Sequence, residues 1–349
     1  MILPEIHSDY GTVHYKPAGF SIHAHRNTLH RRHGPNAYAK SVRKYKIGPT
    51  NHTPFFFDEI AAWPDNRMAI VQAEDIHNDS EYACPITVGS PGVTLILDFD
   101  TGSSDFWVRS SEFEQTVRKL KAIVCTPPTK VEPLNEFQKP AVGVSQHLSD
   151  EFLKDGSDGL LGLAFPKLNT VKPYQQKTPM QNMVEQGLIK DAIADFYRQA
   201  RQHDSHGFYT FGYISEHIHA SKLYWQDVIS DNGGGKVCGL PYVKIGHNIY
   251  DRGHLNTAII DTGTTLILMD DRTVENLYSQ IPGAKLDRTL GGYIFPTDAC
   301  VPKLAFSIGK WLFTIPSEDL AFSDAGDGMA YGAIQSRGQN KQDILGTCS

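Results

Sequence analysis

Residues Asp98 to Val108 read D-F-D-T-G-S-S-D-F-W-V, and residues Ile259 to Leu266 read I-I-D-T-G-T-T-L. In both stretches an apolar run leads into Asp-Thr-Gly, and small hydroxyl residues follow. A single Asp-Thr-Gly is more often a plain turn, because Asp and Gly are turn-forming residues. Two copies with matching lead-ins instead predict that Asp100 and Asp261 meet. Their separation, 261 − 100 = 161 residues, is about the length of one domain, so we expect two similar lobes.

The alternation of side chains in residues 93–100 predicts an extended strand that delivers Asp100 to a turn. Gly102 and Gly263 suit such turns because glycine lets the backbone approach a neighbour closely. We expect the hydroxyls of Thr101 and Thr262 to form hydrogen bonds across the junction of the two lobes. These bonds would hold the carboxylates rigidly.

Two carboxylates a few ångströms apart share one proton and titrate as a pair. Such a pair can take a proton from a water molecule that attacks an amide carbonyl and can give a proton to the carbonyl oxygen. This chemistry requires no metal, cofactor or covalent intermediate, and we predict none.

Four further stretches resemble motifs of the pepsin family of aspartic proteases, especially the secreted fungal group typified by penicillopepsin and aspergillopepsin. The resemblance covers roughly residues 35–346 and keeps the motifs in the family's order. The stretches are D-G-L-L-G-L-A-F at Asp158 to Phe165, F-G-Y-I at Phe211 to Ile214, G-A-I-Q-S at Gly332 to Ser336, and I-L-G at Ile344 to Gly346.

The resemblance implies a mostly β, bilobal fold preceded by a pro-segment, and an endopeptidase that hydrolyses polypeptides at acidic pH as a monomer. By motif match, Asp100 and Asp261 take the catalytic roles. Gly102, Gly263 and Thr264 lie where the family hydrogen-bonds the substrate backbone. We expect a pro-segment and linker at 1–80, an N-terminal lobe at 81–205 and a C-terminal lobe at 206–349.

Charge is distributed unevenly along the chain. Residues 1–50 carry eight Lys or Arg against Glu5 and Asp9, a net charge of 8 − 2 = +6, so the remainder carries −6 − 6 = −12. A basic run alone is typical of solvated surface, or of a segment that binds nucleic acid or an anionic membrane. Residues 37–45, A-Y-A-K-S-V-R-K-Y, instead resemble the family's pro-segment, so we predict neither nucleic-acid nor membrane binding.

That resemblance implies that Lys44, followed by Tyr45, lies across the cleft and pairs with the two carboxylates. Acid would then neutralise the carboxylates and release the basic N-terminal segment of residues 1–50, which we call the leader. Six histidines in the first 33 residues have irregular spacings, which do not predict a metal site.

The sequence departs from the family in three places. The interval from Val108 to Asp158 has no tyrosine, so the β-hairpin flap that closes over substrate is expected to be missing. There, residues 112–124 read as polar and helical, and the C-T-P-P of residues 125–128 is a poor strand sequence. The sequence stops three residues after Gly346, which predicts missing C-terminal strands. Cys300 matches one half of a family disulfide whose other half is Ala330 here.

These departures leave two alternatives open beside the enzyme. One is a catalytically impaired descendant that binds peptides or hydrophobic metabolites in the inherited cleft. The other is a mis-spliced gene model. The family is normally secreted, although the first thirty residues show no signal peptide.

Overall fold

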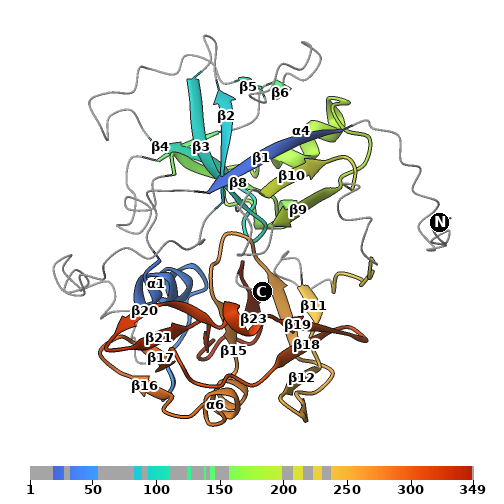
Figure 1. Cartoon of the computed structure of the whole chain (residues 1–349). Helices are drawn as coiled ribbons and strands as arrows, with labels where there is room; N and C mark the ends of the chain where they lie inside the picture. The colour runs from blue at the N-terminus through green and yellow to red at the C-terminus, as the bar shows by residue number, and fades with distance from the viewer. Residues whose placement is uncertain are drawn as a thin grey trace.

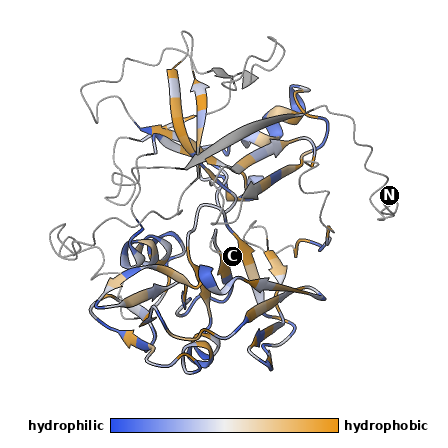
Figure 2. Ribbon diagram, in the orientation of Figure 1, coloured by the Kyte–Doolittle hydropathy of each residue, from blue (hydrophilic) through white to orange (hydrophobic). Residues whose placement is uncertain are grey.

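The computed structural model of the chain describes residues 19–26, 32–53, 82–88, 93–109, 124–126, 137–138, 142–145, 157–198, 207–214, 223–229 and 237–347. The described residues form two β-rich lobes, one above the other in Figure 1, and the prediction of a mostly β fold is confirmed. In Figure 2 most of the hydrophobic colour lies on the strands, whereas the helices carry hydrophilic stretches.

One sheet holds the strands of the first lobe, in the order β7-β4-β8-β3-β2-β1-β10-β9, with β5 attached to β2 and β6 to β5. Its strands are β1 (Phe20–Arg26), β2 (Tyr82–Val88), β3 (Val93–Asp100), β4 (Phe106–Arg109), β5 (Val124–Thr126), β6 (Phe137–Gln138), β7 (Gly143–Ser145), β8 (Gly159–Gly162), β9 (Ala194–Arg198) and β10 (Gly207–Phe211).

Three smaller sheets build the second lobe, in the orders β11-β14-β23-β15-β22, β13-β12-β18-β19 and β16-β17-β21-β20. Their strands are β11 (Val237–Gly239), β12 (Tyr242–Ile245), β13 (Asn248–Asp251), β14 (Thr257–Ile260), β15 (Ile267–Met269), β16 (Lys285–Asp287), β17 (Gly292–Pro296), β18 (Leu304–Ile308), β19 (Trp311–Ile315), β20 (Ala321–Gly326), β21 (Met329–Gly332), β22 (Ile334–Ser336) and β23 (Asp343–Leu345).

Helices are short in the described part of the chain, and none there is long and apolar enough to cross a membrane. Residues 178–181 begin α4 with a capping box, in which the Thr178 hydroxyl accepts from the Gln181 amide and the Gln181 side chain accepts from the Thr178 amide. The helical segments are α1 (Gly34–Lys44), η1 (Pro166–Leu168), α4 (Pro179–Glu185), α6 (Asp271–Tyr278) and η2 (Ser317–Asp319).

The same local arrangement occurs once in each lobe. In the first, β3 pairs in parallel with β8, so that Asp100 lies opposite Gly162. In the second, β14 pairs in parallel with β23, and Ile260 lies opposite Leu345. Each Asp-Thr-Gly turn therefore follows a strand that is held in place by a parallel neighbouring strand. That neighbour carries the G-L-L-G of residues 159–162 in the first lobe and the I-L of residues 344–345 in the second.

One detail differs from the sequence expectations, and one boundary falls inside a sheet. A strand, β5, forms at the edge of the stretch that reads as poor strand, and it pairs with β2 through Cys125 and Thr126. The predicted lobe boundary at 205/206 falls between β9 and β10, which are antiparallel neighbours in the first-lobe sheet. The sequence around residue 206 gives no local signal for this pairing, because β10 also pairs with β1, which lies far away in the sequence.

The leader helix α1 shares a hydrophobic core with the second lobe. Its N-terminus has His33 as cap and a proline in the first turn. Tyr38, Val42 and Ile47 are almost fully buried in this core, and the Tyr38 hydroxyl donates to the Ser336 carbonyl at 2.6 Å. The leader is therefore packed as an integral element of the described fold.

We expect Tyr38→Ala to lower the free energy of unfolding by about 3–5 kcal/mol, as for other buried aromatic side chains cut back to alanine. Tyr174→Ala is the control, because Tyr174 is 78% exposed and its loss should change stability by less than about 0.5 kcal/mol. Urea unfolding measures both. Equal stabilities of the two variants would show that α1 is not part of the core.

Candidate active site

The structure brings Asp100 and Asp261 together at the junction of the lobes, around the ammonium of Lys44. The Lys44 Nζ lies 3.0 and 2.9 Å from the two Asp100 oxygens, and 3.1 and 2.9 Å from the two Asp261 oxygens. Both aspartates are buried, each with 1% exposure. One cation thus contacts all four carboxylate oxygens.

Each carboxylate is also held by its own turn. The Gly102 amide donates to Asp100 Oδ1 at 2.7 Å, and the Gly263 amide donates to Asp261 Oδ1 at 3.1 Å. The Thr264 hydroxyl adds a hydrogen bond to Asp261 Oδ2. In this structure the residues predicted to contact substrate therefore hold the carboxylates. Their contacts with substrate stay a prediction.

The two glycines are required because each turn touches the opposite aspartate. A Cβ on Gly102 would lie 2.5 Å from Asp261 Oδ1, and a Cβ on Gly263 would lie 2.5 Å from Asp100 Oδ1. Neither distance is possible for real atoms. The backbone at each glycine thus lies close to the aspartate of the other lobe, as expected of glycine at these positions.

Two threonines join the lobes reciprocally, as expected from the sequence. The Thr101 amide donates to the Thr262 hydroxyl at 3.1 Å, and the Thr262 amide donates to the Thr101 hydroxyl at 2.9 Å. Their hydroxyls donate in turn to backbone carbonyls of the opposite lobe, Thr101 to Ile260 at 2.9 Å and Thr262 to Phe99 at 2.6 Å.

The surroundings of Asp100 and Asp261 shift the pKa values of the two carboxyl groups in opposite directions. Burial raises the pKa of Asp100 to about 6; Lys44 opposes the rise, and the neighbouring charge of Asp261 adds to it. Burial also acts to raise the pKa of Asp261, but Lys44 together with hydrogen bonds from Asp100, Thr264 and Tyr45 brings it below the usual range. Asp100 is thus the proton holder of the pair in the leader-bound state.

Tyr45 contacts the same carboxylate as Lys44. Its hydroxyl donates to Asp261 Oδ2 at 2.6 Å. Burial and then the charge of Asp261 raise the pKa of Tyr45 well above its usual value, so it stays a donor. Burial lowers the pKa of Lys44, but the charges of Asp100 and Asp261 overcome this and raise it. The two leader residues that the resemblance selects both reach the paired aspartates.

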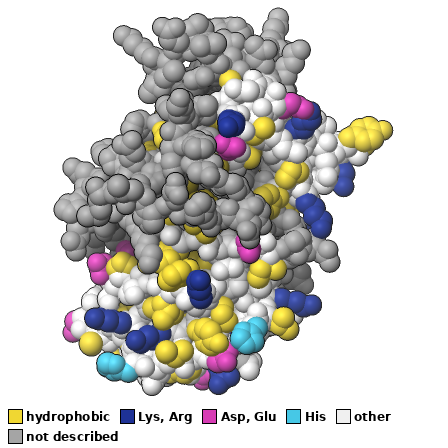
Figure 3. Space-filling model, turned by 90° about the vertical axis from the view of Figure 1, so that its right-hand side faces the viewer, with side chains coloured by type: hydrophobic (Ala, Val, Ile, Leu, Met, Phe, Trp, Pro, Cys, Tyr) yellow, Lys and Arg dark blue, Asp and Glu magenta, His cyan; other side chains and the backbone are white. Residues whose placement is uncertain are grey.

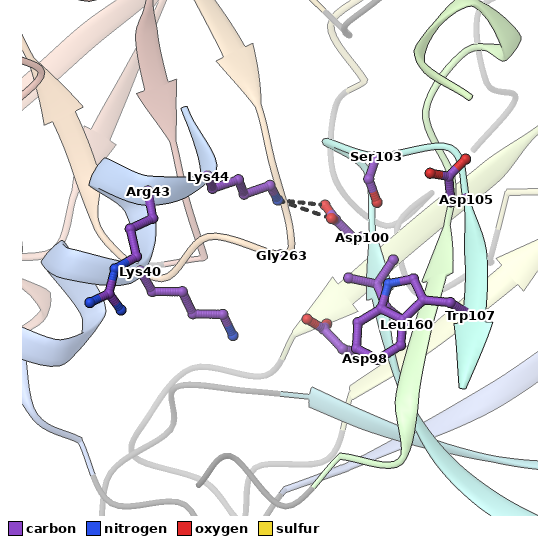
Figure 4. Close-up of a pocket in the computed structure, with 10 residues that line it drawn as sticks. All are labelled: Lys40, Arg43, Lys44, Asp98, Asp100, Ser103, Asp105, Trp107, Leu160 and Gly263. Carbon is purple, nitrogen blue, oxygen red and sulfur yellow. Dashed lines mark hydrogen bonds and ion pairs between the residues drawn. The ribbon is translucent and has the colours of Figure 1, made fainter. Parts of the chain in front are cut away.

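A pocket of about 250 Å³ opens beside Asp100 and is shown in Figure 4. The leader supplies three cationic side chains to it, at helical spacings that place them on one face of α1. The resemblance selects only Lys44 of the three, although the i, i+3, i+4 spacing of Lys40, Arg43 and Lys44 is visible in the sequence. The lining residues are Lys40, Arg43, Lys44, Asp98, Asp100, Ser103, Asp105, Trp107, Leu160 and Gly263.

Other expectations fall partly or wholly outside the described residues. Most of the interval predicted to lack a flap is outside, as are the first 18 residues. Cys300 is exposed and carries a free thiol, and Ala330 is buried. The described residues contain no cluster of three His, Cys, Asp or Glu side chains arranged to bind a metal ion. On the second-lobe face in Figure 3, cationic and anionic side chains are interspersed.

The pKa directions predict how stability depends on pH. Because the pKa of Asp100 is about 6 in the folded chain, above the usual value of about 3.9, folding favours its protonated form. This contribution is complete below about pH 4 and is lost as the pH rises through about 6. Asp261 acts oppositely: its contribution is present above about pH 4 and is lost in stronger acid.

Asp100→Asn removes the first titration and keeps the shape of the side chain. We expect the melting temperature of the parent to fall, relative to that of Asp100→Asn, between pH 5 and pH 7.5. Thermal unfolding of both proteins in matched buffers measures this. Parallel curves over that range would contradict a raised pKa at Asp100.

Comparisons with known proteins show the family to which the chain belongs. The sequence profile described as eukaryotic aspartyl protease matches residues 81–130 and 134–348. Aspergillopepsin-1 of Aspergillus oryzae is 34% identical over 291 residues, which cover 74% of this chain and 71% of the relative. Penicillopepsin-1 of Talaromyces stipitatus is 32% identical over 335 residues, covering 88% and 82%.

A solved structure supports the fold independently. The crystal structure of the aspartic proteinase from Irpex lacteus superposes with a TM-score of 0.63 at 19% identity, and the match covers 77% of this chain and 88% of that chain. The profile match spans both Asp-Thr-Gly turns and both strands that pair with them. The chain therefore belongs to the eukaryotic aspartyl protease family.

Proposed function

We propose that this chain is an aspartic-type endopeptidase in which Asp100 and Asp261 activate water to hydrolyse peptide bonds in acid. The observation that carries the proposal is the single point, now taken by Lys44 Nζ, that lies 2.9–3.1 Å from all four carboxylate oxygens. A water molecule at that point would be within hydrogen-bond distance of both aspartates.

Asp261 accepts from the Gly263 amide and the Thr264 hydroxyl, contacts that do not involve Lys44 or Tyr45, and we assign it the ionised role on this ground. Asp261, ionised, accepts a proton from the water while the water oxygen attacks the peptide carbonyl carbon. Asp100, protonated, gives its proton to the carbonyl oxygen, so a neutral tetrahedral diol forms. Asp261 then returns its proton to the amide nitrogen, a diol hydroxyl returns one to Asp100, and the C–N bond breaks. The products are an amine and a carboxylic acid.

We infer that residues 1–80 form an inhibitory pro-segment and linker, and that the chain is secreted like the fungal proteases it resembles. The leader contacts support inhibition, since Lys44 and Tyr45 take up the oxygens that a water and substrate would need. The polypeptide substrate would take the place of Lys44 and Tyr45 at the aspartates, with Gly102, Gly263 and Thr264 near its backbone. No observation favours the peptide-binding or metabolite-binding alternative over this proposal.

We expect Asp100→Asn and Asp261→Asn each to reduce acid proteolysis by about 10²–10⁴-fold, because a neutral amide cannot hold or accept the shared proton. Asp298→Asn is the control, since Asp298 is exposed in a turn of the second lobe. Cleavage of a fluorogenic peptide from pH 3 to pH 7 measures all three. Activity that survives in either dyad variant would rule out the dyad.

Lys44→Ala should strengthen binding of a pepstatin-like peptide to the full chain by at least about tenfold near neutral pH, because a buried ion pair no longer competes with the ligand. Lys46→Ala removes the same charge from the same segment at an exposed position and should leave the affinity unchanged.

Calorimetry gives both affinities directly. If Lys44→Ala and the parent bind the ligand equally, Lys44 does not block the site, and the pro-segment assignment fails even if the dyad is catalytic.

A further inference from the structure

Tyr209 lies directly behind the junction of the two Asp-Thr-Gly turns. Its hydroxyl donates to the carbonyl of Phe99 at 3.3 Å. The same carbonyl accepts the Thr262 hydroxyl from the other lobe at 2.6 Å. Phe99 immediately precedes Asp100, so one carbonyl next to a catalytic aspartate is held from both lobes.

The ring of Tyr209 is fixed by aromatic neighbours. It stacks on Phe196, with ring centres 4.6 Å apart and planes at 25°, and it packs against the ring of Phe99 at 4.9 Å and 57°. Only 2% of Tyr209 is exposed. Burial raises the pKa of its hydroxyl well above the usual value, and a hydrogen bond with Thr262 opposes the rise. The hydroxyl therefore stays protonated and is held toward the junction.

The two halves of the junction differ. The Thr101 hydroxyl donates to the carbonyl of Ile260 at 2.9 Å, where Ile260 is 40% exposed. Phe99, at the equivalent position of the first lobe, is fully buried. Solvent can compete at the Ile260 half but not at the Phe99 half, where the second donor is a tyrosine.

The strand that carries Tyr209 also touches the leader. In the upper lobe of Figure 1, β10 lies between β1 and β9, and Tyr209 pairs in register with Ile22 of β1 and Phe196 of β9. Because β1 belongs to the leader, the place of Tyr209 in the sheet depends on a strand that the leader supplies.

We propose that Tyr209 is a positioning residue that holds the Phe99 carbonyl, which also accepts the Thr262 hydroxyl, and thereby fixes the turn of Asp100 against that of Asp261. It acts through Phe99 and Thr262 and takes no proton in the reaction. Its effect on rate rests on the proposed function, whereas its effect on the junction does not.

The amides of Thr101 and Thr262 report on the junction because each donates to the hydroxyl of the other. Tyr209→Phe removes one hydroxyl and keeps the ring. A buried hydrogen bond contributes about 0.5–1.5 kcal/mol, so we expect these two amides of the full chain to exchange with solvent about 3–10-fold faster, measured by NMR. Amides of β12 in the second lobe should keep their rates.

Tyr278→Phe is the matched control. Tyr278 is also almost fully buried, and its hydroxyl also donates to a backbone carbonyl, that of Ile334, at 2.7 Å. This variant should leave the Thr101 and Thr262 amides unchanged. An equal acceleration in both variants would mean that any buried tyrosine hydroxyl has the effect, and would overturn a positioning role.

A second variant keeps the test decisive if Tyr209→Phe does not fold. Phe196→Leu retains the Tyr209 hydroxyl but removes the ring on which Tyr209 stacks, and it should accelerate the same two amides. Parental exchange rates at Thr101 and Thr262 in whichever variant folds would refute the proposal.

The catalytic consequence is measured separately. If the chain cleaves peptides, Tyr209→Phe should lower kcat with KM unchanged, since substrate contacts are not altered. Faster exchange at Thr101 and Thr262 without any measurable cleavage by the parent would support the positioning role and count against the proposed function instead. A change in KM alone, with kcat at the parental value, would contradict positioning of the aspartates.

Discussion

Two buried carboxylates lie against each other at the junction of the lobes, and like charges at this distance cannot both ionise without compensation. The rest of the site follows from this constraint. Lys44 supplies the compensating charge at 2.9–3.1 Å from all four oxygens, while amides and hydroxyls satisfy the remaining acceptor positions. The unequal supply of donors to Asp261 is what separates its acidity from that of Asp100.

The backbone around the carboxylates is arranged so that neither lobe can complete the site alone. Gly102 leaves room for Asp261, and Gly263 leaves room for Asp100. The threonine hydroxyls donate to carbonyls of the opposite lobe. A shift of one lobe would therefore break hydrogen bonds in both turns at once, so the distance between the aspartates is a property of the whole bilobal fold.

The leader is held by two different kinds of interaction. On one side of α1, Tyr38 and Val42 pack into the core of the second lobe. On the other, Lys40, Arg43 and Lys44 line a pocket to which the first lobe contributes Asp98, Asp100 and Asp105. Apolar packing changes little with pH, whereas the charged contacts depend on it. Because Asp261 stays ionised in mild acid, neutralising Asp100 alone leaves one ion pair to Lys44 in place, and release of the leader requires more than the first proton.

The sequence by itself determined the repeated turn and the pairing of Asp100 with Asp261, because these depend on local motifs in a fixed order, and its resemblance to the family implied the approach of Lys44. Only the tertiary structure decided which strands share a sheet, so that β10 joins the first lobe and the short β5 pairs with β2. It alone placed Lys40, Arg43 and Tyr209 at the site and gave the two aspartates different acidities. These features depend on burial and on neighbours distant in sequence, which no local pattern records.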